Sequence, residues 1–112
     1  MDNLNIDERE IIEQLLVEYA NFLGNDDRVR VELVLDKKSD RYLLIEIGWD
    51  LGRRIYGVLI HIDIIDGKLW IQQDGTEEGV ADELADLGIP KERIVLAYKS
   101  LQRRQITEFA VN

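Results

Sequence analysis

The chain has one histidine, so any imidazole chemistry must use His61. Asp63 follows two residues later, and on an extended strand its carboxylate shares a face with the imidazole. A carboxylate placed there can raise the pKa of an imidazole and orient it as a base. Trp70 and Gln72 are expected across a hairpin, and no serine shares their face. Because a nucleophile is missing, we expect a structural or interface histidine, and an enzyme using His61 and Asp63 ranks third among our alternatives.

Basic residues form two small clusters. Arg53 and Arg54 are adjacent, and a second cluster, Lys99–Arg104, lies within residues 98–104. Direct DNA binding through these clusters is one alternative, which would give a steep salt dependence. Arginines beside aromatic residues are as typical of protein interfaces, and intrachain salt bridges are equally expected. The candidate interface residues are therefore His61, Asp63, Trp70, Gln72, Arg53, Arg54, Tyr98, Arg103 and Arg104.

Acidic residues concentrate between positions 74 and 86. Clustered carboxylates suit a divalent cation, but their spacing matches no calcium-binding loop, and helix N-termini favour acids in any case. A solvated helix face is the preferred interpretation. We accordingly predict no catalytic residue, no cofactor and no metal site. The acidic set is Asp74, Glu77, Glu78, Asp82, Glu83 and Asp86.

Composition indicates one globular domain over residues 1–112. The chain carries 23 acids against 14 bases, a formal net charge of −9, with 46% hydrophobic residues and no cysteine. Thiol catalysis, disulfides and cysteine–zinc sites are thereby excluded. Autonomous binding to DNA or to an anionic membrane is disfavoured, since both are polyanions. No apolar run of about 20 residues and no basic-then-apolar leader is visible, so we expect a cytoplasmic protein.

Hydrophobic periodicity predicts the elements that position these residues. Period 3.6 over residues 6–23 indicates a helix, with Asn5 and Glu8 as a capping box and Gly24 as its stop. Period two then predicts four strands in an antiparallel meander. The strands are expected at about residues 28–35, 43–49, 54–65 and 68–73.

The Asp66–Gly67 pair is a strong hairpin signal and sets a register. Ile65 then faces Lys68, and further along His61 faces Gln72. For the preceding hairpin, a four-residue loop at 50–53 and a three-residue loop give opposite faces. The four-residue loop puts Leu43, Ile45, Ile47, Tyr56 and Val58 on the helix-covered face with Ile60, Ile62 and Ile64.

The other sheet face would then carry Leu44, Leu59 and Trp70 beside polar residues. A solvated face rarely holds three large apolar side chains together, so we expect the C-terminal segment or a second copy of the chain to cover it.

Beyond the meander, Asp74 and Glu77 are expected to cap a second helix over about 75–87, which Gly88 ends. A helical turn at 91–93 and a fifth strand at 94–98 follow, and residues 106–111 form a sixth strand or a packed extension. The predicted fold class is α+β: an antiparallel meander of four strands plus one or two C-terminal strands, with a long N-terminal helix and a second helix packed on one face.

Several blocks together resemble one known family. They are Gly48–Asp50, Arg54–Gly57, His61–Ile64, Asp66–Glu77, Gly88–Lys91, Ile94–Leu96 and Thr107–Val111. They look like the XisI family, the cyanobacterial fdxN-element excision controlling factors. Ala97, Lys99 and Leu101 stand where the family tends to have glycine, histidine and proline, which leaves the geometry of residues 98–104 open.

The resemblance implies an accessory factor in programmed DNA excision during heterocyst differentiation, in which a separate site-specific recombinase cuts and rejoins the DNA. Such proteins are typically encoded beside XisH-like proteins, which resemble nucleases. We therefore expect a non-enzymatic regulatory subunit that binds an XisH-like partner, contacts DNA indirectly, and forms a homodimer in one version of the hypothesis. The family has no established catalytic residues to transfer.

Overall fold

The computed structural model describes residues 7–24 and 27–112 and confirms the α+β class. The first half of the described chain holds one long helix and the long strands. The second half holds short elements. In chain order they are α1 (Glu8–Leu23), β1 (Val29–Asp36), β2 (Arg41–Asp50), β3 (Arg53–Ile65), β4 (Lys68–Asp74), α2 (Val80–Asp86), the 3₁₀ turn η1 (Lys91–Arg93), β5 (Ile94–Leu96) and α3 (Leu101–Arg104).

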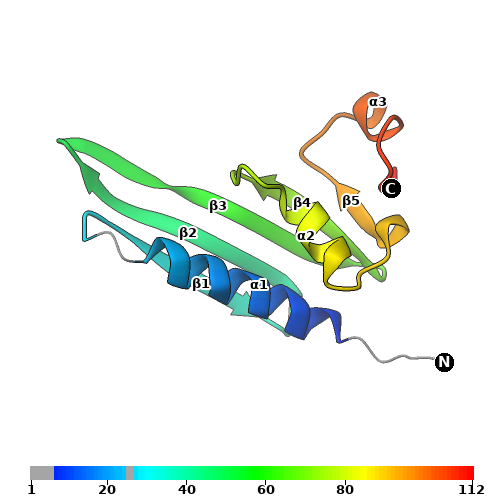
Figure 1. Cartoon of the computed structure of the whole chain (residues 1–112), viewed down its shortest axis with the longest axis horizontal. Coiled ribbons are helices and arrows are strands. Elements are labelled where there is room, and N and C mark those ends of the chain that lie inside the picture. The colour runs from blue at the N-terminus through cyan, green and yellow to red at the C-terminus, as the bar shows by residue number, and fades with distance from the viewer. Residues whose placement is uncertain (1–6, 25–26) are drawn as a thin grey trace.

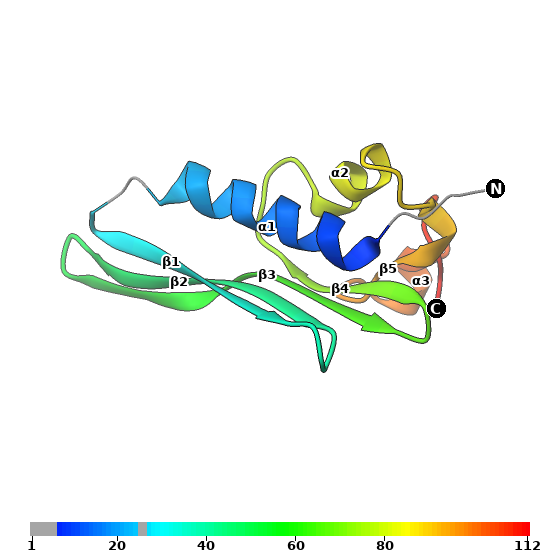
Figure 2. The same ribbon diagram turned by 90° about the horizontal axis from the view of Figure 1, so that it is seen from below.

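The strands form one sheet in the order β1-β2-β3-β4-β5. The first four are an antiparallel meander, as predicted, whereas β5 pairs with β4 in parallel, so the sheet is mixed. Both α1 and α2 lie on the same side of this sheet (Figure 2). We call the side that they cover the helix face and the opposite side the outer face.

The core lies between the helices and the helix face. The apolar stripe of α1 buries Ile12, Leu15 and Leu16 against β2 and β3, where Tyr42 and Ile60 are fully buried. Each such side chain contributes about 1.5–3 kcal/mol by leaving water. The remaining strand and α2 residues of this core are Leu44, Ile62, Leu69, Ile71, Val80, Ala81, Leu84, Ile89, Ile94 and Leu96.

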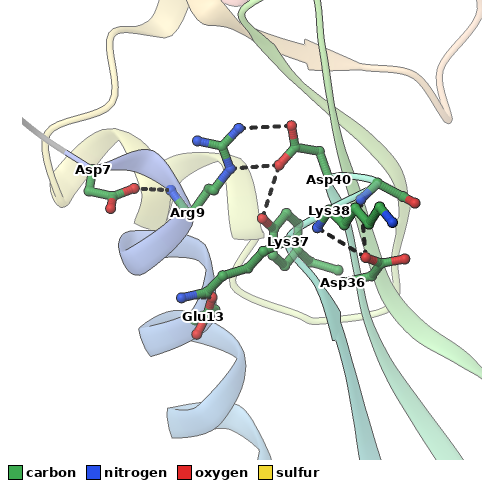
Figure 3. A network of polar contacts seen from close by, with 9 residues as sticks. Asp7, Arg9, Glu13, Asp36, Lys37, Lys38 and Asp40 are labelled. Atoms are coloured by element: carbon green, nitrogen blue, oxygen red, sulfur yellow. Dashed lines mark hydrogen bonds and ion pairs between the residues drawn. The ribbon is translucent and has the colours of Figure 1, made fainter.

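Polar contacts join the start of α1 to the turn between β1 and β2 (Figure 3). Arg9 donates two hydrogen bonds to the Asp40 carboxylate, at 2.7 and 3.0 Å, and Lys37 lies 3.2 Å from Glu13. The Arg9 guanidinium holds the pKa of Asp40 below its ordinary value. Asp7 caps α1, and the predicted cap Asn5 lies outside the described residues.

The turn at Asp66–Gly67 has the predicted type I′ geometry, with positive φ at both residues. The register from Ile65 opposite Lys68 to Ile62 opposite Ile71 is confirmed. The last predicted pair is wrong, because a β-bulge between His61 and Ile62 places His61 opposite Gln73 instead of Gln72.

The connection between β2 and β3 corrects the predicted faces. Its turn has only two residues, Leu51 and Gly52, and a bulge follows at Leu59, so that Leu44 pairs with Ile60. One extra residue in β3 reverses the inside–outside alternation on the hairpin side of the bulge. Leu44 and Leu59 therefore pack against the helices. The side chains predicted for the helix face lie on the outer face: Leu43, Ile45, Ile47, Tyr56 and Val58.

The second helix begins later than predicted. Gly79 has φ 90°, which interrupts the chain just before Val80, so α2 starts there and not at residue 75. The N-cap residue is Gly79 and not the predicted Asp74, although Asp74 Oδ2 accepts a hydrogen bond from the Val80 amide at 2.8 Å. Residues 75–79 are a loop held by the same carboxylate, whose Oδ1 accepts from Thr76.

The C-terminal segment resolves two open alternatives. The predicted fifth strand is shorter, ending at Leu96, and residues 106–111 are a packed extension that contributes one bridge, Val95 to Ala110. Val95 is fully buried, and Arg104 stacks on Trp70 at 5.8 Å. The C-terminal segment therefore covers the β4–β5 end of the outer face. This was one of the two predicted alternatives, the other being a second copy of the chain.

Candidate interaction surface

The outer face is open where β1, β2 and β3 form the sheet. Trp49, Tyr56, Val58 and Val34 are exposed there, and between them lie half-buried apolar side chains of β2. This part of the sheet extends away from β4, β5 and the C-terminal segment, and it ends at the turn between β2 and β3 (Figure 1). The half-buried members of the row are Leu43, Ile45 and Ile47.

Four residues lie around this turn at the end of the outer face, and we call them the hairpin-tip cluster. They are Trp49, Leu51, Arg54 and Tyr56. Trp49 and Arg54 are cross-strand partners, and the Arg54 guanidinium lies 5.4 Å from the Trp49 ring and 5.7 Å from the Tyr56 ring. The exposed fractions are 58% for Trp49, 70% for Tyr56 and 94% for Leu51. The guanidinium thus contacts two large exposed aromatic rings at once, and each such contact is worth about 0.5–1 kcal/mol at an exposed site.

Leu51 occupies an unfavourable backbone region. Its φ is 51°, a left-handed conformation in which glycine or asparagine is the usual residue and which costs other L-residues about 1–2 kcal/mol. A large apolar side chain that is both strained and exposed gains nothing from the fold of the monomer. Strain of this kind gathers at binding sites.

His61 and Asp63 lie further along the outer face, towards the C-terminal segment. His61 Nε2 lies 2.8 Å from Asp63 Oδ1, and the Gln72 amide donates to the other carboxylate oxygen at 3.4 Å. The side chains of His61 and Asp63 are only 28% and 14% exposed. The predicted shared face of His61, Asp63 and Gln72 is thus realised as one hydrogen-bonded group, which suits an interface or a structural role.

Arg104 holds the C-terminal segment together. Its guanidinium donates to four carbonyl oxygens, those of Leu96, Ala97, Lys99 and Val111, at 2.9–3.2 Å. Arg103, which precedes Arg104 in the chain, is exposed on α3. Tyr98 is 44% exposed, and the Lys99 ammonium lies 5.9 Å from its ring.

The two basic clusters do not meet. Arg53 and Arg54 lie at the hairpin tip, and the cluster of residues 98–104 lies at the opposite end of the molecule (Figure 1). Arg54 is stacked on two rings, and Arg104 is bound to main-chain carbonyls. The arrangement brings Arg54 together with aromatic residues, and it does not join the two clusters into one basic surface.

A separate acidic hollow lies on the helix face between α1 and the loop before α2. Tyr19, Phe22, Glu78 and Glu83 line it, and the Tyr19 hydroxyl donates to Glu83 at 2.8 Å. Burial, followed by this hydrogen bond, raises the pKa of Tyr19 to about 12, and burial also raises the pKa of Glu83. Its carboxylates would repel a phosphate group.

Two features are absent from residues 7–24 and 27–112. Within these ranges no three histidine or acidic side chains are grouped so that they could hold a metal ion. Among the helices of the same ranges, none is long and apolar enough to cross a membrane.

Comparison with known proteins identifies the family. The family model described as "XisI protein" matches residues 1–111. The chain belongs to the XisI family. Two solved XisI-family structures from Anabaena variabilis are similar over 93% of this chain and 95% of their own: a XisI-like protein (39% identity, TM-score 0.85) and the fdxN element excision controlling factor XisI (31% identity, TM-score 0.80). No curated protein sequence matches the chain.

Sequence reasoning named Arg54 but missed its neighbours in this XisI-family protein. The sequence pattern places Tyr56 on the helix face because the bulge at Leu59 gives no sequence signal, and it predicts Trp49 only as a strand residue and Leu51 only as part of a loop. One signal was available. Trp49, Arg54 and Tyr56 flank a Gly-containing turn at matching distances, which is the pattern of a cross-strand aromatic–arginine cluster.

Proposed function

We propose that this XisI-family protein is a non-enzymatic accessory factor that controls excision of a DNA element by binding an XisH-like partner protein. The hairpin-tip cluster is the observation that supports it. Tryptophan, tyrosine and arginine are the residues that dominate binding energy in protein interfaces. Here three of them are stacked together, largely exposed, at the end of an open apolar sheet face.

The role in excision follows from the name of one similar structure, the fdxN element excision controlling factor XisI. The net charge of −9 supports action through a protein partner, because an acidic protein gains little from phosphate contacts. In this proposal DNA is contacted by the partner or the recombinase, and the XisI-family chain adjusts their assembly.

The experiment is co-expression with an XisH-like protein, followed by affinity purification and measurement of the dissociation constant. Trp49→Ala, Arg54→Ala and Tyr56→Ala should each weaken the complex by about tenfold, since truncating an interface hot spot typically has at least that effect. All three positions are exposed, so the circular dichroism spectrum should be unchanged.

The matched control is Phe22→Ala. Phe22 is an aromatic residue with 78% exposure on α1, on the helix face of the sheet, and its loss should leave binding as in the wild type. Two results would refute the proposal: separate elution of the two wild-type proteins, or a complex that tolerates all three substitutions at the hairpin tip.

A further inference from the structure

The sheet has an open edge at β1. Within the described residues β1 is the terminal strand, and its only strand neighbour is β2. The Trp49 amide donates to the Arg28 carbonyl at 3.1 Å, which makes the even-numbered residues of β1 the hydrogen-bonded partners of β2. The amides and carbonyls of Val29, Val31 and Leu33 therefore point away from the sheet, towards a further strand.

This edge carries few of the features that prevent pairing. Natural edge strands are usually short, bulged, interrupted by proline or marked by lysine. β1 has eight residues in regular register with β2, and neither proline nor lysine occurs between Val29 and Asp36. Its apolar side chains on the helix face, among them Val31 and Leu33, are only half-buried.

We propose that β1 of one chain pairs antiparallel with β1 of a second copy, around a two-fold axis at Val31. Hydrogen bonding requires odd-numbered residues of the two copies to face each other, because their backbone groups point to the open edge. An axis at Arg30 or Glu32 meets this condition too, but it places like charges opposite each other. At Val31 it pairs Val31 with itself and Val29 with Leu33, giving about six new backbone hydrogen bonds.

Charge selects this register. The axis at Val31 places Arg30 of each copy directly opposite Glu32 of the other, in a non-hydrogen-bonded pair where side chains are closest. Within one chain these two residues are only loosely paired, at 4.0 Å, and both are exposed. An axis at Leu33 would place Arg30 opposite Asp36, whose carboxylate already accepts from the Lys38 and Ser39 amides.

The helix above β1 is compatible with this dimer. Glu13 of α1 reaches Lys37 beside the end of β1, so helical periodicity puts Val17 and Ala20 on the same flank of α1. Val17 is 39% exposed and Ala20 is half-buried. Two α1 helices side by side across the two-fold axis would cover these small apolar side chains.

Sedimentation equilibrium over a concentration series tests the dimer. The wild type should reach twice the chain mass of 13.0 kDa. Arg30→Glu places two carboxylates opposite each other at each contact, and Glu32→Arg places two guanidinium groups there, so each variant alone should dimerise about tenfold more weakly or worse. Mixing the two variants restores opposite charges at both contacts and should recover a heterodimer.

Arg103→Glu and Asp86→Arg are the matched controls. They change net charge by the same amounts at exposed positions away from the β1 edge, and they should dimerise as the wild type does. A monomeric wild type, single variants that dimerise normally, or a mixture that stays monomeric would each overturn the proposal. The hairpin-tip substitutions should leave the dimer intact, so failure of partner binding and failure of dimerisation are separable.

Discussion

At the scale of residues, the Arg104 side chain links several parts of the C-terminal segment. Five interactions converge on its guanidinium, four with carbonyl oxygens and one with the Trp70 ring. A charged donor shared among partly buried acceptors is harder to replace than an exposed ion pair, because its loss removes hydrogen bonds from several carbonyl oxygens at once.

Arg104→Ala should lower the free energy of unfolding by about 1.5–3 kcal/mol, since partly buried carbonyls lose a charged donor. Urea unfolding followed by tryptophan fluorescence measures it. Arg103→Ala, at the exposed neighbouring position, should change stability by less than about 0.5 kcal/mol. Equal effects of the two substitutions would show that the carbonyl contacts contribute little.

The Asp40 carboxylate should make stability depend on pH in the acid range. Its hydrogen bonds from Arg9 lower its pKa in the folded state. A lowered pKa stabilises the fold above the unfolded value of about 4, and this contribution is lost as pH falls through the folded value.

Comparing urea midpoints at pH 7 and pH 3 checks this expectation. Asp40→Asn should lose less stability than the wild type between the two values, because the variant has no carboxylate to protonate. Asp86→Asn, at an exposed position on α2, serves as the control and should follow the wild-type curve. Parallel curves for all three proteins would contradict the expected role of Asp40.

At the scale of elements, the approach of β1 to β2 depends on one glycine. A Cβ on Gly48 would lie 2.2 Å from the Arg28 carbonyl oxygen and 2.7 Å from the Val29 Cα, main-chain atoms just before and at the start of β1. Gly48→Ala should therefore destabilise the protein by about 1–3 kcal/mol as β1 is pushed away.

Gly57→Ala is the matched control for this substitution. Gly57 lies on the adjacent strand, and a Cβ there meets nothing within 4 Å. Thermal unfolding should show a clear loss for Gly48→Ala and little change for Gly57→Ala. A tolerated alanine at Gly48 would mean that β1 can shift without cost, which would also weaken the case for a well-defined β1 edge.

Elements with strong local signals were predictable from the sequence. The stripe of α1, the alternation of β1 and the Asp66–Gly67 turn all follow from side-chain periodicity or backbone preference. The two bulges and the turn at Leu51 were not predictable, because leucine gives no signal for positive φ and a bulge depends on packing against distant residues.

The bulge at Leu59 also determines which side chains form the hairpin-tip cluster. Arg54 could be named from its type alone, but the sheet face of Trp49 and Tyr56 depended on one extra residue at Leu59. The role of Arg104 could not be predicted from the sequence either, because its acceptors are main-chain carbonyls that only the folded C-terminal segment brings together.

At the scale of the whole molecule, the two halves of the sheet differ in how many neighbouring strands and helices protect their backbone amides. Pairing of β3 with β4 begins at Ile60, so residues 53–58 of β3 have a strand neighbour on one side only. The other half of the sheet has α2 on one face and the C-terminal segment beside β5 (Figures 1 and 2). The hairpin tip therefore belongs to the least stable part of the described fold.

Hydrogen exchange followed by mass spectrometry should show this gradient. Amides of residues 50–56 should exchange faster than those of residues 60–64 and 69–71, which are paired on both sides. Binding of an XisH-like partner should slow exchange at the tip. Uniform protection along β3 in the free protein would contradict the gradient.

The turn at Asp66–Gly67 also has a consequence for how the chain reaches this structure. The strands β1 to β4 are joined by turns of two to four residues, so most of their contacts are local, whereas β5 joins the sheet only after α2 has crossed over it. Local contacts form early, since they need little loop closure. We therefore expect Gly67→Ala to slow refolding and Arg104→Ala mainly to accelerate unfolding in stopped-flow experiments. The meander is the expected folding nucleus, and the C-terminal segment closes over Trp70 last.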